Sequence, residues 1–166
     1  MSILKKTLIA SAALALPFSV SANSKLEKMM SDPNQWVQQS GNYAGERYTE
    51  LDQINKSNVG SLKVAWSFST GVLRGHEGSP LVIGDVMYVH TAIPNIVYAL
   101  DLNDDQKILW KYNPVKGGKY PGGETMDRVI SVMCCDNVNR GVNYHPNGTI
   151  VLHAADTSVI ALDAKT

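Results

Sequence analysis

The chain has two cysteines, and they are adjacent in the stretch VMCCDNVNRG at positions 132–141. An ordinary disulfide joins Cα atoms about 4.4 to 6.8 Å apart, whereas neighbours across a trans peptide lie about 3.8 Å apart. A bridge between Cys134 and Cys135 would therefore be strained, and its ring would be too small to stabilise the fold much. It would instead form a rigid, flat, polarizable patch suited to a planar ligand, because strain of this kind occurs mainly at functional sites.

Three other interpretations of the cysteines remain open. Each could pair with a cysteine elsewhere in a longer chain, both could be buried thiols, or they could form half of a metal site. Zinc signatures usually space their cysteines by about two to four residues, and an exported compartment disfavours free thiols. Arg140 follows shortly after, and its guanidinium can donate two hydrogen bonds to a carboxylate of a ligand at the patch; the alternative is an ordinary surface arginine.

The compartment is indicated by the first 22 residues. Lys5 and Lys6 precede an apolar run over 7–18 that is too short to span a bilayer. Small residues follow at Val20-Ser21-Ala22, so we expect a signal peptide over 1–22, cleaved after Ala22, and a periplasmic protein. A retained membrane anchor is the alternative.

Charge and length narrow the class of protein further. Cleavage would remove two of the 15 basic residues and none of the 15 acidic ones, leaving a net charge of minus two and no basic excess to favour nucleic acid. Residues 23–166 suffice for one modest domain. Because the sequence stops inside a repeated pattern at 160–166, we expect the N-terminal part of a larger protein.

The elements that must position these residues are mostly short strands. Ser24 and Glu27 have the spacing of a capping box and predict a short helix ending near Asp32-Pro33. Gly84-Asp85 lies between two β-rich runs and signals a hairpin. Alternating or β-rich runs predict an all-β fold with strands at 63–69, 81–83, 86–89, 96–100 and 108–112.

One part of this pattern is repeated. Residues 84–89 and 97–101 recur as 147–152 and 159–163, an offset of 62 to 63 residues. Repeats of this kind are typical of propeller blades, which bury their faces by stacking on neighbours. Since the offset exceeds the usual blade length of about 40 to 50 residues, we expect an insertion, placed at 114–136.

Several polar and aromatic residues are interpreted as structural. The four histidines are scattered, without the spacing of metal ligands. Asp101 and Asp163 recur at equivalent repeat positions, which favours turn capping, and Trp66 and Trp110 lie in strand patterns that favour packing. The histidines are His76, His90, His145 and His153.

Two long motifs resemble one known family. The stretches at 133–141 (MCCDNVNRG) and 69–81 (STGVLRGHEGSPL) closely resemble the pyrroloquinoline quinone (PQQ) dependent methanol dehydrogenases. Residues 51–55 resemble the family's N-terminal segment, and 161–166 the start of its tryptophan docking motif. Residues 72–80 look more like the lanthanide-dependent than the calcium-dependent type. The glycine- and lysine-rich segment 116–128 departs from the family, whose connection there is usually shorter.

The resemblance implies an eight-bladed β-propeller, of which this chain supplies the first blades, with PQQ between a vicinal disulfide and a tryptophan. Cys134 and Cys135 would form that disulfide, Arg140 would pair with a PQQ carboxylate, and Glu77 would contact the cofactor as a hydrogen-bond partner. A metal ion, lanthanide in preference to calcium, and a catalytic aspartate would be supplied by residues beyond 166. The implied partners are a small alcohol and a periplasmic cytochrome c, and the implied assembly is a homodimer.

Two other functions are weighed against this one. The first is a noncatalytic periplasmic propeller that binds proteins, and it is disfavoured because a scaffold has no use for Glu77, the cysteine pair and Arg140 together. The second is a PQQ enzyme for another alcohol or an aldehyde. Neither the chain's isolated repeats nor its composition separates these alternatives.

Overall fold

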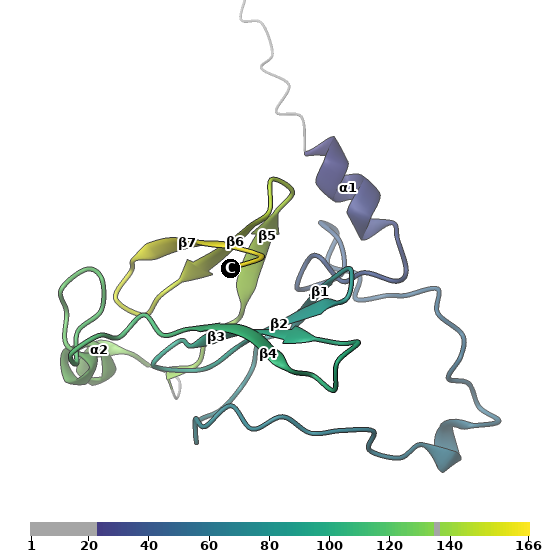
Figure 1. The fold of residues 1–166 in the computed structure, drawn as a ribbon, viewed down its shortest axis with the longest axis horizontal. Helices are drawn as coiled ribbons and strands as arrows, with labels where there is room; N and C mark the ends of the chain where they lie inside the picture. Colours follow the sequence, from purple (N-terminus) through teal and green to yellow (C-terminus); the bar gives the residue numbers. More distant parts are fainter. Residues whose placement is uncertain (1–22, 135–136) are drawn as a thin grey trace, which may run out of the picture.

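The computed structural model describes residues 23–134 and 137–166, which form two antiparallel sheets with two short helices beside them (Figure 1). The first sheet has the order β1-β2-β3-β4 and the second the order β5-β6-β7. Their strands are β1 Leu81–Ile83, β2 Val86–His90, β3 Val97–Asp101, β4 Ile108–Tyr112, β5 Val142–His145, β6 Thr149–His153 and β7 Val159–Asp163.

The predicted hairpin and most predicted strands are confirmed. Gly84-Asp85 joins β1 to β2, with Ile83 opposite Val86, and Gly84 has a φ of 57°, in the left-handed region that glycine adopts readily. The repeat is also real, because β2 and β3 pair with Val86 opposite Asp101, and β6 and β7 pair with Thr149 opposite Asp163. The two sheets are therefore built on the same hairpin unit.

The main core lies between the two sheets. Alternate residues of β3 serve its two faces: Val97 and Ala99 belong to the core shared with the second sheet, whereas Tyr98 and Leu100 belong to a cluster on the opposite face. This explains why β3 is buried on both faces. The shared core consists of Leu81, Tyr88, Val97, Ala99, Val142, Ile150, Leu152 and Ala164.

Two polar groups fasten the sheets to each other. The Tyr88 hydroxyl donates a hydrogen bond to the Ala164 carbonyl at 2.9 Å, and the Trp110 Nε1 donates to the same oxygen at 3.1 Å. Burial is the main cause that raises the pKa of Tyr88 to about 12, so its hydroxyl stays a donor at neutral pH. Trp110 is thus a packing residue, as predicted.

The prediction of a strand at 63–69 is wrong for this structure. In the segment between α1 (Ser24–Met30) and β1, Trp36 is bridged to Val82 of β1; the chain then loops out from the sheets, and its one helical or strand element in the described structure is the 3₁₀ turn η1 (Val59–Ser61) (Figure 1). A strand requires a neighbour for its backbone hydrogen bonds, and among the described residues none pairs with 63–69. Val64 is 87% exposed and Trp66 39% exposed, so Trp66 is not a core residue here.

Within 63–69, Phe68 is the residue that packs against the sheet. Its ring lies edge-on to Tyr98, with centroids 5.1 Å apart, and the Tyr98 hydroxyl donates to the Thr70 carbonyl at 2.8 Å. These contacts bring the segment back across the outer face of the first sheet. They also set the position from which residues 71–80 lead into β1.

The predicted insertion contains a helix that the sequence reasoning missed. After a turn at 116–119, the helix α2 runs over Met126–Val132. The Thr125 hydroxyl oxygen caps it by accepting from the Arg128 backbone N–H at 3.2 Å. Val129 is buried with Tyr120, Ile93 and Ala154, so α2 is anchored to both sheets' connections.

The first helix is confirmed, but its cap is not the predicted one. The helix α1 spans Ser24–Met30, and the Asn23 side chain, not that of Ser24, accepts from the Leu26 backbone N–H at 3.2 Å. Asn23 precedes the helix with extended backbone, as a capping residue does. No helix within the described ranges is long and apolar enough to cross a membrane.

Candidate functional site

The fold brings two of the predicted site residues, Glu77 and Arg140, together at one end of the two sheets. Glu77 lies four residues before β1, and Arg140 lies two residues before β5. The edge strands β1 and β5 lie side by side. Residues 63 positions apart in the chain therefore meet where these two strands begin.

Glu77 and Arg140 are in direct contact. The Arg140 Nε lies 3.2 Å from the Glu77 Oε2, and their side chains are 81% and 51% exposed, respectively. Glu77 thus obtains its cation from within the chain. Because the guanidinium is so exposed, most of its donors face solvent and are accessible to an anionic ligand.

Cys134 lies two residues after the last residue of α2 and is exposed at the surface. No cysteine in the described part of the chain is a free thiol, and Cys134 takes part in a disulfide. Cys135 lies outside the described residues, so the predicted bridge between Cys134 and Cys135 stays a prediction. The helix α2, capped by Thr125, therefore fixes the position of the backbone at Cys134.

The loop from 137 to 141 that carries Arg140 is tied to both sheets. The Ile93 backbone N–H donates to the Asn137 carbonyl at 3.1 Å, on the side of the first sheet. The Asn139 side chain donates to the His153 carbonyl at 2.9 Å and accepts from the Gly141 N–H at 2.9 Å, on the side of the second. These hydrogen bonds therefore fix the backbone from which the Arg140 side chain extends.

His90, at the end of β2, lies beneath this loop. Its side chain is only 5% exposed, and its Nε2 is 2.9 Å from the Asn139 carbonyl oxygen. Burial is the main cause that lowers the pKa of His90; the contact with Asn139 acts in the opposite direction. Its Nδ1 is buried and makes no hydrogen bond to any described residue.

An open hollow of about 500 Å³ adjoins Arg140. It is lined on the sheet side by Asn95 and His153 and on the loop side by Val138 and Asn139. The side-chain Oδ1 of Asn95 accepts a hydrogen bond from the Ala155 backbone N–H at 2.9 Å, which fixes the orientation of the Asn95 side chain. A planar acid could lie in this space with a carboxylate toward Arg140.

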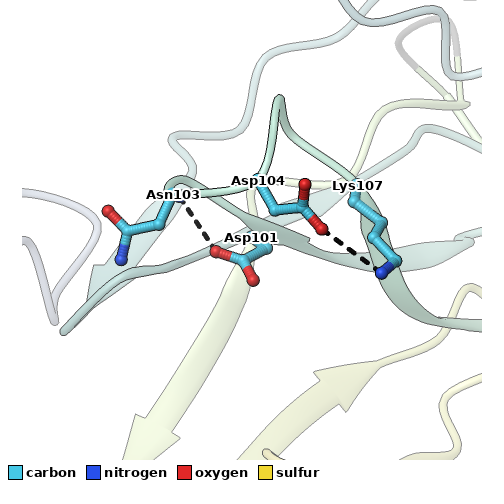
Figure 2. Close-up of polar contacts among 4 residues, drawn as sticks. All are labelled: Asp101, Asn103, Asp104 and Lys107. Carbon is cyan, nitrogen blue, oxygen red and sulfur yellow. Dashed lines mark hydrogen bonds and ion pairs between the residues drawn. The ribbon is translucent and has the colours of Figure 1, made fainter.

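The repeated aspartates cap turns, as predicted. The Asp101 Oδ1 accepts from the Asn103 N–H at 2.9 Å, next to the ion pair of Asp104 with Lys107 (Figure 2). The Asp163 Oδ1 accepts from the Lys165 N–H at 2.7 Å in the equivalent turn. Within the described ranges, no group of three or more histidine, cysteine, aspartate or glutamate side chains is arranged to hold a metal ion.

Sequence reasoning missed three contributors to the site: His90, Gly78 and Asn139. His90 was interpreted only as a structural residue, although the alternating pattern of the preceding residues could have predicted that it is buried. Gly78 follows Glu77 directly and carries no local signal of its role. Asn139 stands within the cysteine motif, but only the fold shows that it connects the motif to β6.

The stacked, repeated antiparallel sheets are those of a β-propeller, of which this chain forms a part. Residues 36–166 match the family described as PQQ, glucose/ethanol/alcohol dehydrogenase, β-propeller domain. The chain belongs to this family.

Its relatives are alcohol dehydrogenases. The chain is 54% identical to the lanthanide-dependent methanol dehydrogenase of Methylorubrum extorquens over 93% of its length and 24% of the relative's. It is 45% identical to methanol dehydrogenase [cytochrome c] subunit 1 of Paracoccus denitrificans, over 87% of this chain and 22% of that protein. Among solved structures, a europium-containing methanol dehydrogenase matches with a TM-score of 0.78 and 52% identity, over 87% of this chain and 23% of that one. The chain thus spans about a quarter of the length of these relatives.

Proposed function

We propose that the protein carrying this chain is a periplasmic, PQQ-dependent alcohol dehydrogenase that oxidises methanol to formaldehyde. The oxidation removes two electrons and two protons from the alcohol, and the quinone supplies the two-electron acceptor when bound. The electrons then pass to a cytochrome c. The complete propeller would have eight blades, and the protein would act as a homodimer after cleavage of residues 1–22, which lie outside the described residues.

The observation that carries the proposal is the meeting of Glu77 and Arg140 beside the cysteine motif. PQQ is a planar acid with several carboxylates, so its binding needs a flat surface and a cation. Arg140 offers a guanidinium largely open to solvent, and the hollow next to it leaves room for a ring system. The residues present therefore fit the cofactor.

Each residue of this wall has a distinct role in the proposal. Arg140 binds a carboxylate of the cofactor, and a bridge of Cys134 with Cys135 supplies the flat surface on which the ring system lies. Support for the bridge comes from the disulfide of Cys134 in a chain that has two cysteines in all. Glu77 accepts or donates a hydrogen bond near the same carboxylates and orients Arg140.

The metal is proposed to be a lanthanide, with calcium as the alternative. The relative with 54% identity is named as lanthanide-dependent, and the similar solved structure is named as europium-containing. The metal ligands and the catalytic aspartate would come from residues beyond 166. A noncatalytic scaffold and an enzyme for other alcohols or aldehydes are the alternatives to the proposal, and no contact in the site favours either.

The proposal is tested by substituting the cation in the full-length protein. Arg140→Ala should weaken equilibrium binding of PQQ to the apo-protein by about tenfold to a hundredfold, since a hydrogen bond to a charged group is lost. Arg140→Lys should lie between, because lysine keeps the charge without the planar fork. Glu77→Gln should bind PQQ within about twofold of the wild type if Glu77 acts as a hydrogen-bond partner.

Arg128→Ala is the matched control, because Arg128 is an exposed arginine on α2 outside the proposed wall. It should bind PQQ as the wild type does. Wild-type affinity in the Arg140→Ala variant would contradict the proposed site.

A further inference from the structure

We propose that His90 is a positioning residue that holds the two backbone segments carrying Glu77 and Arg140 against each other. The inference rests on the proposed function, because it concerns the wall that would bind the cofactor. His90 does not line the hollow beside Arg140 and contacts no reacting atom. Its evidence comes from two contacts that the ring makes.

The first contact joins β2 to the loop before β5. The His90 Nε2 is 2.9 Å from the Asn139 carbonyl oxygen. A carbonyl only accepts, so Nε2 carries the hydrogen and the neutral ring leaves a lone pair on Nδ1. Asn139 immediately precedes Arg140 and is itself fixed to the His153 carbonyl. The ring therefore fixes the backbone from which the arginine projects.

The second contact joins the same ring to the segment before β1. A Cβ on Gly78 would lie 1.8 Å from the His90 Cε1 and 3.1 Å from the Arg140 carbonyl carbon. A separation of 1.8 Å is far below any van der Waals contact. Only glycine lets the backbone beside Glu77 approach the imidazole and the Arg140 backbone so closely.

The ion pair of Glu77 with Arg140 is too weak to maintain this arrangement alone. Its side chains are 81% and 51% exposed, and exposed ion pairs contribute little to stability. The His90 ring is buried instead, its hydrogen bond to the Asn139 carbonyl is half-buried, and a carbonyl shielded from water that loses its donor is costly. The geometry of the exposed pair is thus determined by the histidine beneath it.

The variants separate the hydrogen bond from the bulk of the ring. His90→Leu removes the donor to Asn139. His90→Gln keeps one, because the glutamine amide nitrogen lies as many bonds from the backbone as the imidazole Nε2. Gly78→Ala keeps the donor but forces the ring away from the Glu77 segment. Ile150→Val, a buried core change on β6 away from the site, is the control for a general loss of stability.

Three quantities are measured on the full-length apo-protein: the PQQ dissociation constant, the melting temperature and, by crystallography, the separation of Arg140 Nε from Glu77 Oε2. His90→Leu and Gly78→Ala should increase this separation and weaken PQQ binding by about tenfold, as expected for a lost buried hydrogen bond. His90→Gln should restore the affinity to within about threefold of the wild type. Ile150→Val should lower the melting temperature without changing the affinity.

An unchanged separation in folded His90→Leu, or no recovery in His90→Gln, would overturn the positioning role and leave the proposed cofactor site intact. A widened separation with unchanged PQQ affinity would support the role of His90 in holding the two segments together but would overturn the proposed cofactor site. The two failures are therefore distinguishable.

Discussion

At the scale of single residues, the site combines exposed charge with a buried neutral ring. Glu77 and Arg140 are accessible to a ligand, whereas His90 supports them from below and depends on remaining uncharged. Of these three, Glu77 and Arg140 could be identified from the sequence, since their motifs resemble a known family. The role of His90 could not, because a lone histidine after a strand is usually structural and its partners lie 12 and 49 residues away, at Gly78 and Asn139.

The buried ring predicts a pH dependence of stability. Burial lowers the pKa of His90 from its ordinary value of 6.5, and the nearby His76 lowers it further. The unfolded chain titrates near the ordinary value, so below about pH 6.5 it binds more protons than the folded chain does. The contribution of His90 to the free energy of unfolding is therefore complete above about pH 6.5 and is lost as the pH falls through the folded-state pKa.

Denaturant titrations of the apo-protein between about pH 7.5 and 5 measure this dependence. His90→Gln should flatten the profile in that window, because glutamine does not titrate. Glu77, Arg140 and His76 are unchanged in this variant. An equally steep profile in His90→Gln would contradict the assignment of the dependence to His90.

At the scale of elements, the correctly predicted strands have partners adjacent in the chain, but adjacency is not sufficient, because β5 pairs with the adjacent β6 and was not predicted. The hairpins β1–β2 and β6–β7 follow from local alternation and turn residues, which one segment carries by itself. The segment 63–69 has the same alternation, yet it forms no strand because no described strand pairs with it. The helix α2 was missed because it is short and lies in a glycine-rich insertion, where only the cap at Thr125 signals it.

The joint between the two sheets provides a prediction at this scale. Tyr88 and Trp110 donate to the same carbonyl, that of Ala164, so each single loss leaves the oxygen one donor. Tyr88→Phe should therefore reduce the free energy of unfolding by about 1 kcal/mol. Tyr88→Phe combined with Trp110→Phe should cost more than the sum of the singles, because a buried carbonyl is then unsatisfied.

Chemical denaturation of the four proteins in this double-mutant cycle gives the coupling energy. The pair Tyr98→Phe and Trp110→Phe is the control, because the Tyr98 hydroxyl bonds to a different carbonyl. Strict additivity of Tyr88→Phe and Trp110→Phe would show that the two donors contribute independently and are not coupled through the Ala164 carbonyl.

At the scale of the molecule, the 166 residues expose surfaces that a propeller covers. Val64 and Leu73 protrude from the segment before β1, Val159 is exposed on β7, and β7 is an open edge of its sheet. Open edges and uncovered blade faces favour association with other chains. The repeat predicted this stacking from the sequence, whereas the eight blades and the metal site of the proposed enzyme would require residues beyond 166.

Expressed alone, residues 23–166 should therefore associate, and should oxidise no alcohol in the presence of PQQ, metal and a dye acceptor. Size-exclusion chromatography with light scattering measures the association, and Val64→Ser with Leu73→Ser should reduce it. Alcohol oxidation by the isolated 23–166 chain would contradict the assignment of the catalytic groups to residues beyond 166.

The central claim, that Glu77, Arg140 and the cysteine motif form one wall of a PQQ site, is tested most directly on the full-length protein. Its absorption spectrum is recorded first, and methanol-dependent dye reduction is then measured with calcium and with a light lanthanide. We expect an absorption band from the bound quinone cofactor, together with methanol-dependent activity that depends on the lanthanide. Absence of the band after reconstitution with PQQ would contradict the account and favour a noncatalytic propeller.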